Sequence, residues 1–270
     1  MITLIDAHVH LTDEDFSGLL QPAVNMLRSL QIMAVSVSMD MITASKNLEL
    51  ASMYSDVVIP FVGIHPWSAN ENVDAFKDFV SKNADRIAGI GEIGLDRKYV
   101  SDNEEGYSVQ KEVFASMLEL AERLGKPTSI HSRDSVDDVL DMLQSYKLKG
   151  NLLHWFAGSK KQLKRATEMG CFVSYGPVLV YSKDKRSLLR DTPREFVLVE
   201  TDGPVRYARC FEEKTALPSF LPSVVLALAS TLGMDYNETC DILMQNSQQY
   251  LNRTLEKDKI GMIGQLRENE

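Results

Sequence analysis

The chain opens on an apolar run that leads directly into two histidines, Thr3-Leu-Ile-Asp-Ala7-His8-Val-His10. Apolar, β-rich runs recur at fairly regular intervals along the 270 residues. The eight runs cover residues 3–7, 33–38, 57–63, 87–91, 127–130, 150–153, 171–175 and 196–200. Several of them lack apolar–polar alternation, which is typical of strands buried on both faces of a parallel sheet.

The segments between these runs carry apolar residues at three- and four-residue spacing, which predicts helices. They cover residues 21–30, 44–54, 73–82, 107–124, 136–146, 160–169 and 185–190. Strands alternating with helices in this way predict a (β/α)8 (TIM) barrel of the α/β class. Two additional C-terminal helices, residues 219–231 and 236–251, should pack outside the barrel, the second with Asp235 as its N-cap. We expect one domain over residues 1–252 and a polar tail over 253–270.

Composition excludes some classes of protein. A hydrophobic content of 44% with 25% charged residues is ordinary for a globular chain. No apolar stretch is long enough to span a bilayer, and no leader is expected because Met1 lies so close to His8. The three cysteines, Cys171, Cys210 and Cys240, are widely spaced and form no disulfide or zinc pattern. These features favour a monomeric, cytoplasmic protein with no membrane contact. The net charge of −9 argues against capture of duplex nucleic acid through a basic face.

Histidines and acids sit where the predicted strands end. His8 and His10 follow run one, His65 follows run three, Glu92 ends run four, His131 ends run five, His154 ends run six and Asp202 ends run eight. Active sites of such barrels lie at the carboxyl ends of the strands. Scattered structural residues would not be expected to gather on one rim so consistently.

The chemistry of this set is that of a metal site. His-x-His on an extended segment places both imidazoles on one face. Nitrogen and carboxylate ligands without thiolate suit Zn, Mn, Ni or Mg. Four imidazoles and two acids exceed what one ion needs, so we expect two divalent cations about 3.5–4 Å apart. The ligands would then divide as His8, His10 and Asp202 on one ion and His131 and His154 on the other, with Glu92 bridging. Glu92 and Asp202 are also the catalytic candidates, with Asp202 able to accept a proton from water.

These motifs together resemble the ordered motifs of the TatD family of metal-dependent hydrolases. They are His8-Val-His10, Gly63-Ile-His65-Pro, Gly91-Glu92-Ile-Gly-Leu-Asp, His131-Ser-Arg133, His154-Trp-Phe-Ala-Gly-Ser and Glu200-Thr-Asp202-Gly-Pro. The resemblance covers residues 1 to about 252. It implies an amidohydrolase-like barrel, a divalent-metal site and deoxyribonuclease activity, often 3′-to-5′ exonuclease on single-stranded DNA.

The chain departs from the family pattern in the loops. Trp67 stands where the family often has a second histidine, and Trp155-Phe-Ala-Gly replaces Cys-Phe-Ser-Gly. The usual Ser-Pro after the last strand is Gly203-Pro204 here. These loops would shape the substrate pocket, so the motifs support the metal chemistry better than the identity of the substrate.

Several further residues have two interpretations each. His65 would orient a substrate phosphate or simply cap a turn. Arg133 would clamp a phosphate or form a rim salt bridge with Asp134 or Asp96. The aromatic side chains of Trp67, Trp155 and Phe156 would stack on bases or, as we favour, pack the loops. Basic residues also follow several strand ends and would form a collar if they converged. They are Arg97, Lys98, Lys160, Lys161, Lys183, Lys185, Arg186, Arg206 and Arg209.

The sequence therefore predicts a hydrolase that uses metal-activated water on phosphodiesters, with single-stranded DNA as the leading substrate. The alternative is the same metal chemistry on carboxylic esters or amides, such as aminoacyl esters on tRNA. A basic collar at the metals would favour the first and a closed apolar pocket the second. A third possibility, a non-catalytic scaffold, would require that the protein bind no divalent metal.

Overall fold

Eight parallel strands form one barrel in the computed structural model, which describes residues 4–101 and 103–252. The strands are β1 (Leu4–Val9), β2 (Ile32–Ser36), β3 (Val58–Val62), β4 (Gly89–Asp96), β5 (Thr128–Arg133), β6 (Asn151–Leu153), β7 (Phe172–Tyr175) and β8 (Val197–Val199). Each strand pairs with the next along the chain. Beyond β8, the backbone amides of Asp202 and His10 donate to His8 O and Gly203 O, at 3.0 and 2.8 Å, and tie the last segment to the first. The (β/α)8 prediction is confirmed.

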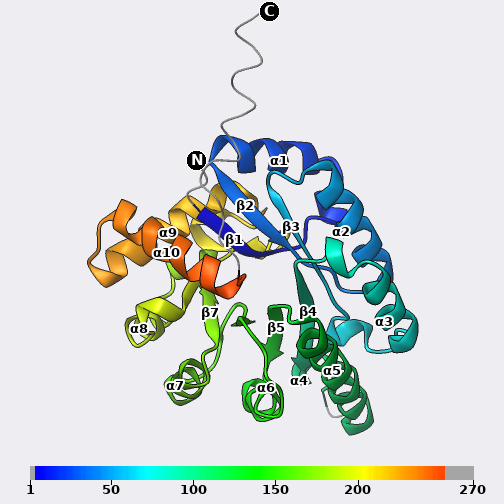
Figure 1. Cartoon of the computed structure of the whole chain (residues 1–270). Coiled ribbons are helices and arrows are strands. Elements are labelled where there is room, and N and C mark those ends of the chain that lie inside the picture. The colour runs from blue at the N-terminus through cyan, green and yellow to red at the C-terminus, as the bar shows by residue number, and fades with distance from the viewer. Residues whose placement is uncertain (1–3, 102, 253–270) are drawn as a thin grey trace, which may run out of the picture.

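Helices surround the strands (Figure 1). They are α1 (Leu20–Ser29), α2 (Met41–Met53), α3 (Val73–Lys82), α4 (Arg97–Val100), α5 (Glu104–Leu124), α6 (Val136–Leu143), α7 (Lys160–Glu168), α8 (Lys183–Arg190), α9 (Leu221–Leu232) and α10 (Tyr236–Tyr250). Asp235 caps α10 as predicted, because its carboxylate accepts from the backbone amides of Asn237 and Glu238. The short helix α4 and a small hairpin of β9 (Arg206–Tyr207) and β10 (Lys214–Thr215) were not predicted.

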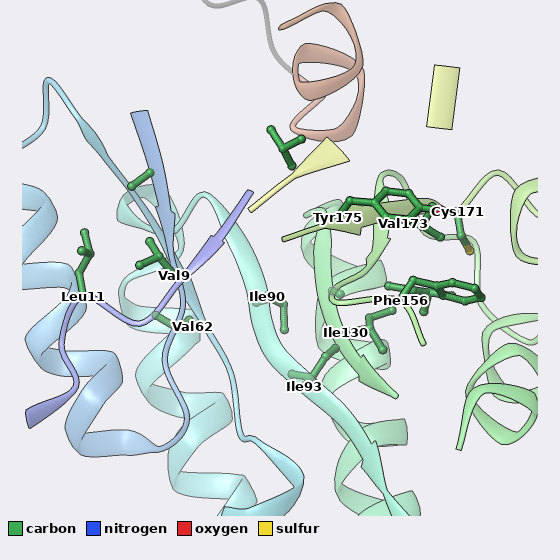
Figure 2. Packing of buried hydrophobic residues seen from close by; sticks show 14 of the residues in the cluster. Val9, Leu11, Val62, Ile90, Ile93, Ile130, Phe156, Cys171, Val173 and Tyr175 are labelled. Atoms are coloured by element: carbon green, nitrogen blue, oxygen red, sulfur yellow. The ribbon is translucent and has the colours of Figure 1, made fainter. Parts of the chain in front are cut away.

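Two apolar clusters fill the fold. One lies between the strands and the helices, where Ile93 of β4 and Ile130 of β5 are register partners and lie side by side (Figure 2). The other includes Phe61, Phe172 and Leu198 and contains no residue from α1 to α9. It also contains Tyr250, whose hydroxyl donates to Thr128 O at the start of β5. The end of α10 thus closes the amino-terminal end of the barrel, which corrects the expectation that this helix packs only outside.

The predicted polar tail at 253–270 lies outside the described residues. Within 4–101 and 103–252, no single helix is long and apolar enough to cross a membrane; Pro218–Leu232 and Tyr236–Tyr250 pass that test only as a pair bent by 107°.

Candidate metal centre

The carboxyl end of the barrel brings together the six side chains predicted as ligands. His8 lies in β1 and His10 follows it, while His154 and Asp202 come shortly after β6 and β8. Two placements differ from prediction, because Glu92 and His131 lie inside β4 and β5 and do not end them. The register of β4 against β5 shifts between Ile90 and Ile93, the step that contains Glu92.

Glycines allow β4 to approach its neighbours at this step. A Cβ on Gly94, whose φ is +138°, would lie 2.1 Å from the carbonyl oxygen of His131. A Cβ on Gly91 would lie 2.9 Å from Ser129 Cβ. Side chains at either position would push β4 away from β5, so these glycines set how deeply Glu92 reaches into the centre.

Glu92 is the middle of the cluster, and its two oxygens face different histidines. Oε2 lies 3.2 Å from His10 Nε2 and 3.4 Å from His8 Nε2. Oε1 lies 2.8 Å from His154 Nε2 and 2.9 Å from His131 Nδ1. This is the arrangement expected of a carboxylate shared between two cations.

Asp202 completes the side of His8 and His10, with Oδ1 3.6 Å from the Nε2 atom of each. Its backbone is in the left-handed region at φ 49°, which is uncommon outside glycine and recurs at functional sites. The positions of the donor atoms also allow a group of His8, His154 and Asp202, and another of His65, Glu92 and His131. The donor atoms therefore lie closer together than a division into two separate ligand sets would require. His65 also belongs to the cluster, although it was not predicted as a ligand.

These donors fit divalent cations. His8 Nε2 and His10 Nε2 lie 3.2 Å apart. Two nitrogens bound to one tetrahedral zinc at 2.0–2.1 Å lie about 3.3 Å from each other. The outer ring nitrogens have partners that would orient them, as Ser129 Oγ lies 2.8 Å from His8 Nδ1 and Asp96 Oδ2 lies 3.0 Å from His131 Nε2.

Burial sets the protonation of this centre. It lowers the pKa of His8 well below the usual range and that of His65 to about 4, so both rings are neutral at pH 7. Burial alone would raise the pKa of Glu92, but the histidines around it hold that pKa well below the ordinary value. Burial would also lower the pKa of His131 and of His10, but Asp96 and Glu92 raise that of His131 to about 9, and Glu92 raises that of His10. A divalent cation would take the place of the protons on these two rings, since it requires neutral imidazoles around an ionised carboxylate.

Two acids of the site were not identified from the sequence. Asp96, considered only as a partner for Arg133, is fully buried and accepts from Trp67 Nε1 at 2.7 Å besides facing His131. Glu200 is also fully buried and accepts from Trp155 N at 2.8 Å, which holds the turn after His154. Both acids belong to the same sequence motifs as the predicted ligands Glu92 and Asp202. Their position within those motifs could have identified them as residues of the site.

The two predicted substrate residues adopt positions with structural partners. Arg133 forms the rim salt bridge, and its partner is Asp96, with Nε and Nη2 3.0 and 2.8 Å from the carboxylate. His65 caps a turn, because its Nδ1 accepts from Trp67 N at 3.1 Å. Its other nitrogen lies 3.2 Å from Glu92 Oε1. Both side chains line the cavity above the centre, so roles toward a substrate stay predictions.

The cavity has a volume of about 1030 Å³, and acids outnumber arginines in the part of its lining away from the predicted ligands, which we call the mouth. Those that line it away from the predicted ligands are Asp13, Asp15, Asp134, Asp137 and Asp138. Of the predicted basic collar only Arg206 lines the cavity. Arg97 pairs with Glu104 and Lys160 with Asp191, each at 2.6 Å, and Lys185 donates to Phe156 O. The basic residues therefore do not converge into a collar at the cavity, and these three cations have partners elsewhere.

A (β/α)8 barrel with a histidine–carboxylate cluster at its carboxyl end defines a metal-dependent hydrolase. The chain belongs to the TatD family, because the family model described as TatD related DNase matches residues 5–252.

Relatives agree with this assignment over nearly the whole chain. The "Uncharacterized metal-dependent hydrolase YabD" of Bacillus subtilis (strain 168) is 25% identical, over 91% of this chain and 97% of the relative. The "3'-5' ssDNA/RNA exonuclease TatD" of Edwardsiella piscicida is 27% identical, over 91% of this chain and 98% of the relative. The crystal structure of YjjV, a TatD homolog from Escherichia coli K12, matches with a TM-score of 0.85 and 22% identity, over 93% of this chain and 99% of that chain, which shows the fold.

Proposed function

We propose that this enzyme uses two divalent cations to hydrolyse phosphodiester bonds, removing nucleotides from the 3′ end of single-stranded DNA. The observation that carries the proposal is the position of Glu92, whose two oxygens face two separate groups of histidines. A carboxylate in that position would bridge a pair of cations, an arrangement that serves in-line displacement at phosphorus. The DNA end and the polarity rest on the name of the Edwardsiella relative.

The predicted ligands would bind the two cations in two groups. His8, His10 and Asp202 would hold one cation, and His131 and His154 the other, with Glu92 shared. Bound cations would supply Lewis acidity that lowers the pKa of water and stabilises charge on the phosphoryl oxygens.

Asp202 is suited to accept the proton that the attacking water loses. Burial raises the pKa of Asp202 to about 8, with the neighbouring Glu92 carboxylate adding to the effect. Without cations the carboxyl group would therefore keep its proton at pH 7. A cation held beside it would lower this pKa and leave a carboxylate that can accept a proton from water.

The acids of the mouth restrict which part of a DNA strand could enter the cavity. An extended polyanion would be repelled by Asp13, Asp15 and Asp134, whereas a chain end places few phosphates near them. The cavity volume of about 1030 Å³ is at the upper end of small-ligand sites, which also favours a chain end over a bound duplex. These features support an exonuclease.

The same acids favour one alternative substrate. A carboxylic ester or amide with a nearby ammonium group, such as an aminoacyl ester on tRNA, would gain attraction from the mouth and need no basic collar. The metal chemistry would be unchanged, so only direct assays separate this function from the nuclease.

The test uses single-stranded DNA labelled at either the 3′ or the 5′ end and protein stripped of metal. Parallel samples receive magnesium, manganese or zinc, and an aminoacyl ester is assayed beside the DNA. We expect metal-dependent shortening from the 3′ end, abolished in Glu92→Gln. Shortening from the 5′ end would overturn the polarity. Hydrolysis of the ester alone, by protein shown to hold its metal, would replace the nuclease with the alternative.

A further inference from the structure

Trp67 is the more exposed of the two tryptophans that line the cavity, since Trp155 is half-buried. It follows β3 in the turn Pro66–Ser68, lines the cavity and keeps 43% of its surface exposed. Phe156, which follows Trp155 after the sixth strand, is fully buried and packs in the core as expected. An indole of this size left open beside a catalytic centre is apolar surface available to a ligand.

The orientation of the indole is fixed from two directions. Its Nε1 donates to Asp96 Oδ2 at 2.7 Å, and Asp96 is fully buried. The ring of Tyr99 stacks on it, with centroids 5.4 Å apart and planes 23° from parallel. A side chain held in this way loses little conformational entropy when a ligand binds.

Arg133 lies over the ring of Trp67, and its own side chain stays 43% exposed. Its guanidinium carbon lies 5.6 Å from the centre of the Trp67 ring, and the carboxylate of Asp96 fixes the group through Nε and Nη2. One buried acid therefore positions both an indole and a guanidinium at the cavity wall. We call this pair, Trp67 and Arg133, the aromatic–guanidinium shelf.

The shelf lies next to the predicted metal ligands. The ring of His65 is 4.8 Å from that of Trp67, and the ring of His131 is 6.4 Å from it. A group resting on the shelf would therefore be the immediate neighbour of a bond held at Glu92. Indole and guanidinium planes both stack on nucleobases, and such stacking tolerates any base because every base has a π face.

We propose that the aromatic–guanidinium shelf stacks one of the two nucleobases that flank the scissile phosphodiester. The inference rests on the proposed nuclease function and adds a base-recognition site to it. Stacking would also explain how a chain end is held without a basic collar, since the attraction comes from a flat apolar surface and needs few phosphate contacts.

The test compares three single-stranded oligonucleotides: an unmodified strand, one with an abasic 3′-terminal residue and one with an abasic penultimate residue. The phosphodiester is the same in all three. For the native enzyme we expect one of the two abasic substrates to lose about tenfold in kcat/KM. Trp67→Leu should remove that preference, so that the unmodified and abasic strands are cleaved with equal kcat/KM. A loss common to all three strands would report the lost hydrogen bond to Asp96 and not base stacking. Trp67→Phe, which keeps an aromatic face, should retain most of the preference.

The outcomes separate the two proposals. Equal cleavage of all three strands by the native enzyme would overturn the shelf and leave the nuclease intact. A preference that persists in Trp67→Leu would place base recognition elsewhere and also overturn it. If no strand is shortened by metal-loaded protein, the nuclease function itself fails.

Discussion

The imidazole of His131 lies against the buried carboxylate of Asp96, with Nε2 and Oδ2 3.0 Å apart. The same ring places Nδ1 2.9 Å from Glu92 Oε1. His131 is thus held between two acids of one strand, β4, and its ring cannot turn without losing both contacts. The burial of Asp96 would raise its pKa, but His131, Arg133 and Trp67 together hold that pKa well below the ordinary value, so the carboxylate stays charged.

Asp96→Asn is therefore expected to weaken metal binding without removing a ligand. An amide in this position loses the charge that orients His131, and changes of this kind cost about 10- to 100-fold in metal affinity. Competition with a chromogenic chelator measures the affinity directly. The matched control is Asp56→Asn, because Asp56 also pairs with an arginine, Arg28, but lies on the surface away from the centre. Equal affinities in the native protein and Asp96→Asn would contradict the orienting role.

The sequence predicted the arrangement of the barrel because strand burial and helix periodicity are local signals. The predicted helix 73–82 coincides with α3, and each predicted strand overlaps an observed one. The end of β4 was missed, since a run ending at Gly91 was expected while the strand continues to Asp96. The reason is that β4 carries polar Glu92 and two glycines at its centre, which hide the apolar pattern.

Gly94→Ala should damage both the fold and the site. A methyl group at φ +138° would meet the carbonyl oxygen of His131 at 2.1 Å, so β4 or β5 must move. We expect a loss of several kcal/mol in the free energy of unfolding, measured by denaturant titration, because overpacking and backbone strain act together. Metal content should fall with it. Gly170→Ala is the control, since its φ is also positive at +77° but a Cβ there meets nothing within 4 Å. Equal losses in both variants would mean that backbone conformation alone is responsible.

Removal of metal should lower the melting temperature. A ligand that binds only the folded state at 100 times its Kd adds about 2.7 kcal/mol. For a chain of this size that corresponds to a decrease on the order of 5–10 °C when EDTA removes one cation. Differential scanning fluorimetry with and without EDTA gives the shift. Glu92→Gln should show a smaller difference between the two conditions, and an EDTA effect as large as that of the native protein would argue that Glu92 is not a ligand.

The cysteines should differ in their reaction with alkylating reagents. Cys171 is fully buried, and burial raises the pKa of its thiol to about 12, so at pH 8 it is almost entirely protonated. Because the thiolate is the reactive form, Cys171 should label only after unfolding. Cys210 is exposed and should label first, with Cys240 slower because burial also raises its pKa. Mass spectrometry of peptides after timed labelling measures each rate, and native labelling of Cys171 as fast as Cys210 would show that the strand opens.

The convergence of the ligand candidates could be predicted from the sequence, and the electrostatics of the mouth could not. Histidines after strand ends converge because the barrel itself brings those ends together. The direction of a long cationic side chain depends on its partner. Lys160 pairs with Asp191, and Arg97 pairs with Glu104. Such pairings join the ends of different helices, so spacing along the chain carries no signal for them.

Neutralising the mouth should therefore improve the binding of a nucleic acid substrate. Asp13→Asn with Asp134→Asn removes two negative charges from the cavity lining. Asparagine is compatible with both positions, since Asp13 caps a turn through its side-chain oxygen and Asp134 has a positive φ of 53°. KM for a single-stranded oligonucleotide should fall severalfold at low salt, and the difference should vanish near 1 M salt, where the screening length is about 3 Å. Asp56→Asn with Asp85→Asn controls for the change in net charge, because it also removes two negative charges and these residues precede β3 and β4 at the opposite end of the barrel. If the mouth variant binds DNA no better than this control, the acids do not face the path of the substrate. If it instead loses activity on an aminoacyl ester, the mouth is built to attract an ammonium group.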